Sequence, residues 1–184
     1  MHKSATDRLH SLIREVSDFP KKGISFKDFT PLLQDAAALA MAVELMANPF
    51  RGSSNSAPNT GVDIVVGAES RGFIFGTALA QALSAGFVPV RKPGKLPYKT
   101  RSMSYALEYG NDTIEIHADA IRPGQRVLLV DDLLATGGTL EACAKLVQEL
   151  QGTIVGLTVL IELTALKGRD RLKQFGHVHS VLTC

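Results

Sequence analysis

Two adjacent carboxylates and a glycine-rich turn occupy one short stretch of this sequence. Asp131 and Asp132 directly follow the apolar run Val127–Val130, and Ala-Thr-Gly-Gly-Thr at 135–139 precedes an expected helix. Free N–H groups at a helix start favour a phosphate, glycine lets the backbone approach it closely, and threonine hydroxyls can donate to its oxygens. Carboxylates accept the hydrogen bonds of paired ribose hydroxyls. The stretch predicts a ribose 5-phosphate pocket, against the plainer alternative of an ordinary strand–turn–helix with acidic turn residues.

Such a pocket needs a strand that ends at the carboxylates and a helix that begins at the glycines. The patterns predict helices at 5–16, 35–48, 72–85 and 138–151, and strands at 62–66, 87–91, 127–130, 154–162 and 178–183. Apolar strands that alternate with helices are typical of a parallel sheet covered on both faces. Ligands bind at the carboxyl ends of the strands in such sheets. We therefore expect an α/β fold with a central, mostly parallel sheet flanked by helices.

A hairpin and a basic loop interrupt this alternation. Residues 105–109 and 113–116 alternate around Gly110-Asn111-Asp112, which predicts a hairpin that projects from the sheet. The loop at 91–101 holds five basic residues and no acid, and the rest of the chain has 15 basic against 18 acidic residues. The total net charge of +2 thus conceals one cationic loop. A basic loop is usually only a solvated surface, but this one is a candidate site for a small polyanion.

Composition limits the class of protein. The chain has 184 residues, 16 of them glycine and 8 proline, which is close to average globular usage and suggests one domain over residues 1–184. The balanced charge argues against a nucleic-acid binder and against a disordered tail protein. Charged residues interrupt the apolar windows that could form a secretory or membrane segment. Cys143 and Cys184 are interpreted as reduced thiols of a cytoplasmic protein.

The stretch 131–139 resembles the phosphoribosyl pyrophosphate (PRPP) motif of type I phosphoribosyltransferases. Further segments are similar, in order and spacing, to the adenine phosphoribosyltransferase family, namely 26–31, 69–73, 91–97, 107–110 and 162–164. The resemblance extends from about Asp18 to Arg169. It implies the type I phosphoribosyltransferase fold, with a flexible hood hairpin at 92–117 and an N-terminal segment, 1–34, over the base site.

The resemblance implies purine salvage, in which PRPP and adenine give AMP and pyrophosphate. It implies two catalytic residues, Glu108 as the general acid/base and Arg71. The implied contacts of the PRPP or AMP ribose phosphate are Asp131, Asp132, Ala135, Thr136, Gly137, Gly138 and Thr139. The implied contacts of pyrophosphate are Ala68, Glu69, Ser70, Arg71, Arg91, Lys92, Lys95 and Tyr109, and those of adenine are Ser25, Phe26, Lys27 and Leu163. A cis peptide at Glu69–Ser70 is also implied.

The same resemblance implies Mg²⁺ carried by PRPP near Asp131 and Asp132, without direct protein ligands, and a homodimer. No nucleic-acid or membrane partner is expected. Many family members carry arginine where Lys27 stands, and a larger apolar residue where Ser25 stands. Three alternatives stay open: a phosphoribosyltransferase for another purine base, a non-catalytic PRPP-binding regulator, and a plain α/β scaffold with an inert turn.

Overall fold

The computed structural model of the chain describes residues 4–52, 61–107 and 110–184. It divides into two compact units, Met1–Leu45 and Met46–Cys184, which we describe separately. The expectation of one domain over 1–184 therefore stays a prediction. Within the described ranges, no helix combines the length and the apolar character needed to cross a membrane.

The first unit contains helices and a two-stranded antiparallel sheet. Its elements are α1 (Ala5–His10), β1 (Arg14–Ser17), β2 (Ser25–Asp28), α2 (Thr30–Gln34) and most of α3 (Ala36–Ala47). The predicted helix over 5–16 is wrong in its second half, because β1 pairs with β2 there. An ion pair of Glu15 with Lys27 joins the two strands. This non-local pairing outweighs the helical spacing of the apolar residues.

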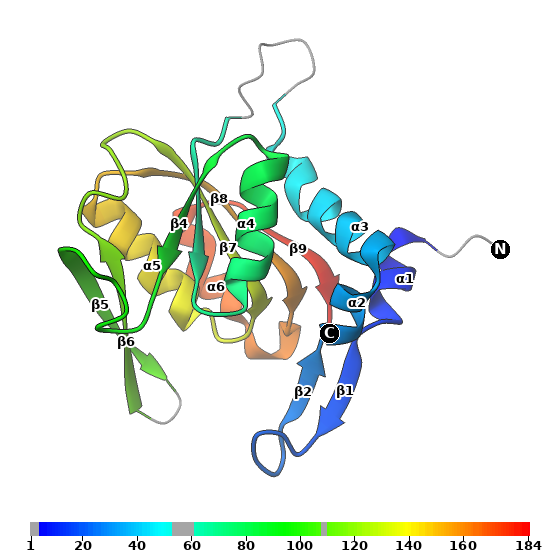
Figure 1. Cartoon of the computed structure of the whole chain (residues 1–184). Helices are drawn as coiled ribbons and strands as arrows, with labels where there is room; N and C mark the ends of the chain where they lie inside the picture. The colour runs from blue at the N-terminus through cyan, green and yellow to red at the C-terminus, as the bar shows by residue number, and fades with distance from the viewer. Residues whose placement is uncertain (1–3, 53–60, 108–109) are drawn as a thin grey trace. The chain divides into compact units, whose positions relative to one another are not determined.

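The second unit is built on a five-stranded parallel sheet with the order β4-β3-β7-β8-β9 (Figure 1). Its strands are β3 (Ile64–Ala68), β4 (Gly86–Val90), β7 (Arg126–Leu134), β8 (Thr153–Glu162) and β9 (Val178–Thr183). Interior strand residues such as Val65, Leu128 and Leu160 are fully buried, as expected of a sheet covered on both faces. The predicted α/β fold with a parallel central sheet is confirmed.

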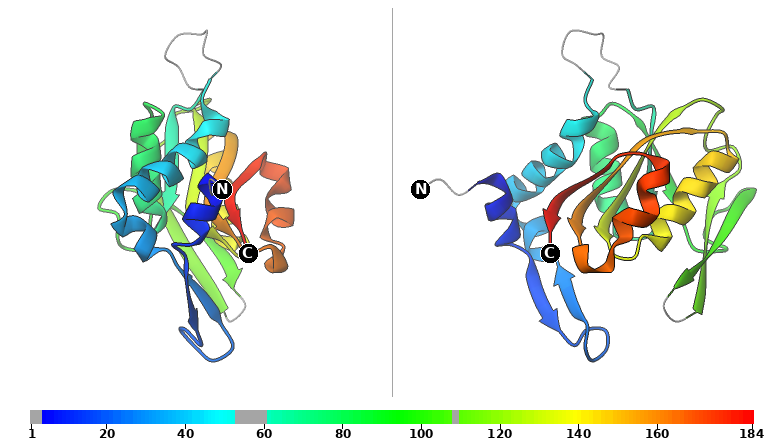
Figure 2. Two further views of the ribbon diagram at one scale, coloured as in Figure 1. Left: turned by 90° about the vertical axis from the view of Figure 1, so that its right-hand side faces the viewer. Right: turned by 180° about the vertical axis from the view of Figure 1, so that it is seen from behind.

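The connecting helices lie on opposite faces of this sheet. Helix α4 (Gly72–Ala82) joins β3 to β4, and α5 (Gly138–Glu149) joins β7 to β8. These connections run in opposite directions along the sheet, so right-handed crossovers place the helices on different faces. Figure 2 shows α4 on one side of the sheet and α6 (Gly168–Leu172) on the other. The direction in which successive strands are added reverses between β3 and β7. Open α/β sheets bind ligands at such a reversal point. Short 3₁₀ turns lie at Asn48–Phe50, Thr164–Leu166 and Lys173–Phe175.

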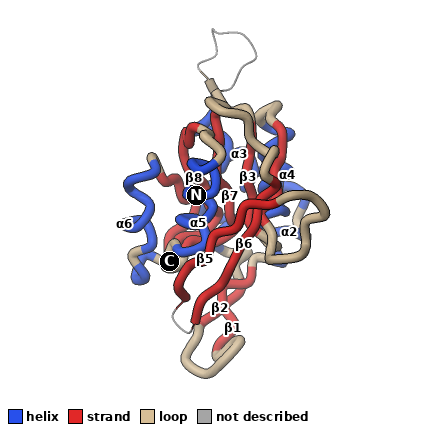
Figure 3. The backbone as a smooth tube through the Cα atoms, turned by 90° about the vertical axis from the view of Figure 1, so that its left-hand side faces the viewer, coloured by secondary structure: helices blue, strands red, loops and turns tan. Residues whose placement is uncertain are grey.

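A long hairpin of β5 (Thr100–Leu107) and β6 (Gly110–His117) completes the second unit (Figure 3). Arg91, just after β4, exchanges backbone hydrogen bonds of 2.9 and 2.7 Å with Glu115, which attaches the hairpin to the sheet. The prediction of a turn at 110–112 is wrong, because residues 110–112 belong to β6 and Gly110 already pairs with Leu107 of β5. In this register Asp112 lies opposite Tyr105, so a residue typical of turns has side-chain partners in a strand.

Candidate active site

Strand β7 carries the two adjacent carboxylates at its carboxyl end. It continues past the predicted end at 130, because β8 pairs with it as far as Leu134. The backbone N–H of Asp132 donates to Oδ1 of Asp131 at 2.9 Å, and the Asp132 residue is only 4% exposed. Gly72 at the start of α4 is needed here, since a Cβ atom on it would lie 2.8 Å from Oδ1 of Asp131. The carboxylates are therefore held between β7 and the start of α4.

Burial dominates the electrostatics of this carboxylate pair. It raises the pKa of Asp131 well above its usual value, and the charge of Asp132 raises it further. Burial also raises the pKa of Asp132, although the Arg71 guanidinium opposes this effect. The Nε atom of Arg71 lies 3.1 Å from Oδ2 of Asp132. The hydroxyl groups of a ligand would supply hydrogen-bond donors, and a divalent cation would supply positive charge. Either would favour the ionised form of both carboxyl groups.

The glycine-rich turn encloses a cavity of about 170 Å³ that is lined by Asp131 and by residues 133–140. Gly137 has a φ of 81°, a conformation that side chains rarely adopt, and α5 begins directly after it. Thr136 and Thr139 contribute to the lining. A helix start with free N–H groups and two hydroxyls is suited to bind a phosphate.

A second cavity, of about 430 Å³, lies where the ends of β3 and β7 approach the hairpin. It brings together many of the predicted residues: Glu69, Ser70, Arg71, Lys92, Asp131, Asp132, Ala135 and Thr139. Its other lining residues, which the sequence did not predict as site residues, are Tyr105, Asp112, Ile114 and Leu133. Tyr105 and Asp112 become neighbours only through the register of the hairpin, which the turn-like composition of 110–112 conceals in the sequence.

The segment after β3 is joined to the cationic loop. Ala68 ends β3, and the Glu69–Ser70 peptide is cis, as the resemblance implied. The Glu69 carboxylate accepts hydrogen bonds from the backbone N–H of Lys92 at 3.0 Å and from Nε of Arg91 at 3.2 Å. The Lys92 hydrogen bond, together with Arg91, lowers the pKa of Glu69. The Arg91 guanidinium also donates to the carbonyl of Lys95 at 3.3 Å, so Arg91 connects Glu69 to the loop.

The expected adenine contacts fall in both units. Ser25, Phe26 and Lys27 lie on β2 in the first unit, where Lys27 pairs with Glu15. Leu163 follows β8 in the second unit, and its backbone N–H donates to the carbonyl of Leu134 at 2.9 Å. The expected general acid/base Glu108 and the neighbouring Tyr109 lie outside the described residues.

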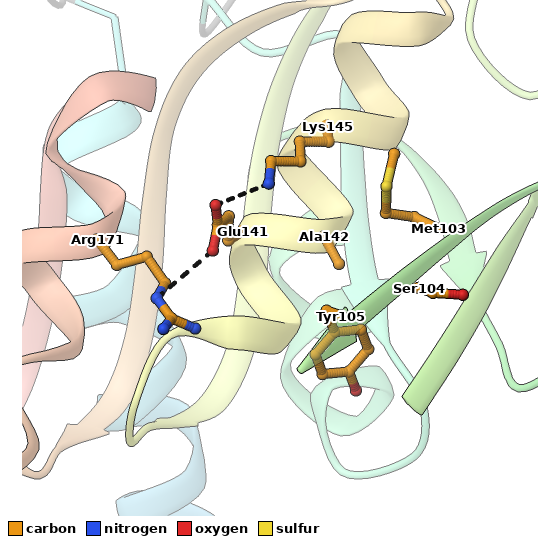
Figure 4. Close-up of a pocket in the computed structure, with 7 residues that line it drawn as sticks. All are labelled: Met103, Ser104, Tyr105, Glu141, Ala142, Lys145 and Arg171. Atoms are coloured by element: carbon orange, nitrogen blue, oxygen red, sulfur yellow. Dashed lines mark ion pairs between the residues drawn. The ribbon is translucent and has the colours of Figure 1, made fainter. Parts of the chain in front are cut away.

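A further cavity of about 370 Å³ shares Tyr105 with the second one (Figure 4). Glu141 forms ion pairs there with Lys145, at 2.8 Å, and with Arg171, at 3.5 Å. One carboxylate thus partly neutralises both cations. Met103, Ser104 and Ala142 complete the lining.

The family model, the curated relatives and the solved structures that this chain resembles are all phosphoribosyltransferases. The phosphoribosyl transferase domain matches residues 33–183. An adenine phosphoribosyltransferase of Symbiobacterium thermophilum is 58% identical over 167 residues, which span 91% of this chain and 93% of that protein. The crystal structure of the Rhodothermus marinus adenine phosphoribosyltransferase superposes with a TM-score of 0.89 at 53% identity, covering 98% of both chains. The Saccharomyces cerevisiae enzyme, complexed with adenine and an imino-altritol bisphosphate, has a TM-score of 0.86 at 36% identity, covering 96% of this chain and 98% of that one.

Proposed function

The chain belongs to the adenine phosphoribosyltransferase family, and on this premise we propose that it transfers the 5-phosphoribosyl group of PRPP to adenine, giving AMP and pyrophosphate. The observation that carries the proposal is the cavity that joins Arg71 and Lys92 with Asp131, Asp132 and the start of α5. Cations for a polyanionic leaving group and carboxylates for a ribose thus line one crevice, at the reversal point of the sheet. The alternative of an inert turn leaves this convergence unexplained.

In the proposed complex, the 5-phosphate of PRPP occupies the turn at 135–139, and the ribose hydroxyls donate to Asp131 and Asp132. Arg71 and Lys92 bind the pyrophosphate, together with backbone groups of 68–71. Positive charge develops on the ribose as the leaving group departs, so cations that stabilise the departing pyrophosphate lower the barrier. The hood hairpin excludes water, which would otherwise compete with the base.

Adenine is proposed to bind to Ser25, Phe26, Lys27 and Leu163. Glu108 exchanges a proton with the base as the glycosidic bond forms or breaks. Lys27 cannot present the planar guanidinium of the arginine that many relatives carry, and its ammonium is engaged with Glu15. Base selectivity is therefore proposed to come largely from backbone groups of this segment.

Magnesium is proposed to arrive with PRPP. Among the described residues, no group of three or more His, Cys, Asp and Glu side chains is arranged to hold a metal ion. Most of its ligands would be substrate oxygens and water, with Asp131 and Asp132 acting through the ribose or a water rather than as direct ligands. When bound, the ion neutralises pyrophosphate charge. We also propose that the protein is cytoplasmic and that it forms a homodimer. Light scattering on the purified protein would test the homodimer.

The proposed activity is tested by incubating the purified chain with Mg²⁺, PRPP and one base at a time. We expect AMP and pyrophosphate in equal amounts with adenine, measured by chromatography and a coupled pyrophosphate assay. Product from hypoxanthine or guanine, but not from adenine, would assign the enzyme to another base. PRPP binding without any product would indicate the regulator.

A Glu108→Gln variant separates chemistry from binding in this assay. We expect it to lower turnover strongly, because the amide cannot exchange a proton, and to change PRPP affinity little. Near-normal turnover in this variant would remove Glu108 from the mechanism while leaving the assignment of the substrate intact.

A further inference from the structure

An ion pair of Lys92 with Asp112 forms part of the wall of the second cavity. Lys92 belongs to the cationic loop, and Asp112 lies on β6. Both carboxylate oxygens of Asp112 have protein donors. Oδ2 accepts from Lys92 and from the Tyr105 hydroxyl, at 3.1 Å, while Oδ1 accepts from the backbone N–H of Thr113, at 2.8 Å. These donors fix the orientation of the carboxylate toward Lys92.

Tyr105 connects this ion pair to the phosphate-binding turn. Its hydroxyl donates to Asp112 and accepts a hydrogen bond of 3.3 Å from Oγ1 of Thr139. Burial raises the pKa of Tyr105 to about 12, so the hydroxyl keeps its proton at neutral pH and remains a donor. A continuous chain of polar contacts therefore runs from the cationic loop through the hairpin to the first turn of α5.

We propose that Asp112 is a positioning residue that holds the Lys92 ammonium in place for the pyrophosphate group, with Tyr105 fixing Asp112 relative to Thr139. This inference rests on the proposed function, which makes pyrophosphate the ligand of Lys92. An ammonium has three donors, so it can keep one on Asp112 and direct the others to phosphate oxygens. The Lys92 side chain is 42% exposed, and a contact that orders it before binding reduces the entropy lost when the ligand arrives.

The opposite role is the main alternative, because a carboxylate beside pyrophosphate also repels it. Burial alone would raise the pKa of Asp112, but hydrogen bonds from Lys92, Thr113 and Tyr105 outweigh burial and lower it. The group is therefore anionic at neutral pH. If repulsion dominates, removal of this charge tightens pyrophosphate binding, whereas loss of positioning weakens it. The two roles thus predict effects of opposite sign.

The test is calorimetric titration of Mg²⁺-pyrophosphate into the wild-type protein and the variants Asp112→Asn, Tyr105→Phe and Lys92→Met. We expect Asp112→Asn to lower the affinity about tenfold, as for the loss of one charge-assisted contact, and Tyr105→Phe to lower it less. In steady-state assays we expect KM for PRPP to rise while KM for adenine stays within about twofold, since Lys92 belongs to the pyrophosphate side.

A double variant shows whether Asp112 acts through Lys92. If it does, Asp112→Asn lowers the affinity of the wild-type protein but leaves that of Lys92→Met unchanged. Ser104→Ala is the matched control, because it breaks the 2.9 Å side-chain hydrogen bond to Thr113 in the same hairpin and should leave the affinity unchanged.

Three outcomes overturn the inference: no pyrophosphate binding by the wild-type protein, unchanged or tighter binding by Asp112→Asn, or an additive loss in the double variant. Pyrophosphate binding by the wild-type protein without AMP formation would contradict the proposed function instead, and the variants would still decide the role of Asp112.

Discussion

Gly168 lies against the backbone of Ala135, so closely that a Cβ atom on Gly168 would stand 2.1 Å from the Ala135 carbonyl oxygen. The same atom would lie 3.0 Å from the backbone nitrogen of Gly137. The segment that follows β8 and carries Leu163 therefore packs directly on the proposed phosphate-binding turn. The shape of that turn depends on a residue more than thirty positions away in the sequence.

Gly168→Ala is expected to distort the turn. The added methyl group must displace backbone, which typically costs about 1–3 kcal/mol of unfolding free energy. We also expect AMP to bind at least about tenfold more weakly, since the phosphate contacts need that backbone. Calorimetric AMP titration and thermal unfolding measure the two effects.

Gly86→Ala is the control for this substitution, because its Cβ atom would meet the end of the flexible Ile64 side chain at 3.0 Å and the Asp63 carbonyl oxygen at an ordinary contact distance of 3.7 Å. Equal losses of AMP affinity in the two variants would contradict a specific role for the Gly168 contact.

Asp131→Asn is expected to stabilise the protein at neutral pH while it abolishes most activity. Because burial raises the pKa of Asp131, the folded state holds a proton more tightly than the unfolded state. The free energy of unfolding therefore falls as pH rises from the unfolded pKa, about 3.9, through the raised folded value. The amide removes this loss, and each kcal/mol recovered raises Tm by about 2–4 °C. Scanning calorimetry from pH 4 to 8 measures the effect.

Asp63→Asn should act in the opposite direction. Hydrogen bonds from Arg126 lower the pKa of Asp63 to about 2, so its contribution to stability is present at neutral pH and is lost as pH falls from about 4 to about 2. A lower Tm at pH 7 in Asp63→Asn and a higher Tm in Asp131→Asn would support the predicted direction of both stability changes. A lower Tm in Asp131→Asn would contradict the effect of burial.

Arg169→Met is expected to destabilise the fold by about 3 kcal/mol, the lower end of the range for breaking a buried ion pair, since Arg169 is partly exposed. Glu162 is 5% exposed and pairs with Arg169. It also accepts a hydrogen bond of 2.6 Å from Ser180. Without Arg169 the Glu162 charge stays buried with too little compensation. Thermal unfolding of Arg169→Met and of the double variant Glu162→Gln/Arg169→Met provides the measurement, and the double variant should recover part of the loss.

The two cysteines should differ in reactivity. Cys143 is buried on α5, and burial raises the pKa of its thiol, while Cys184 is exposed. Because the thiolate is the reactive form, we expect an aromatic disulfide reagent to modify one thiol in the native protein and both after denaturation. Cys184→Ser should remove the native reaction. Fast modification of Cys143 in that variant would contradict the packing of α5.

The sequence predicts the central sheet well, because buried parallel strands appear as apolar runs whose side chains face helices on both sides. It also predicts correctly that the glycine turn joins a strand to a helix, since that pattern is local, although β7 continues through Asp131 to Leu134. The hairpin register is missed because Gly110-Asn111-Asp112 has the composition of a turn, and only the pairing of β5 with β6 shows otherwise. The contacts of Asp112 with Lys92 and of Gly168 with Ala135 join distant positions, and no local pattern reports them.

The ion pair of Glu162 with Arg169 also bears on the order in which the chain can acquire its site during synthesis. Arg169 also donates to Ser180 on β9, so the network depends on the last strand as well as on β8. A nascent chain that has emerged only as far as Glu162 already contains both aspartates and the glycine turn, but it lacks β9, the second parallel neighbour of β8, and the residue that neutralises Glu162. The network of Glu162, Arg169 and Ser180 can be complete only after β9 has left the ribosome, so we expect the segment beside the glycine turn to reach its final order only then.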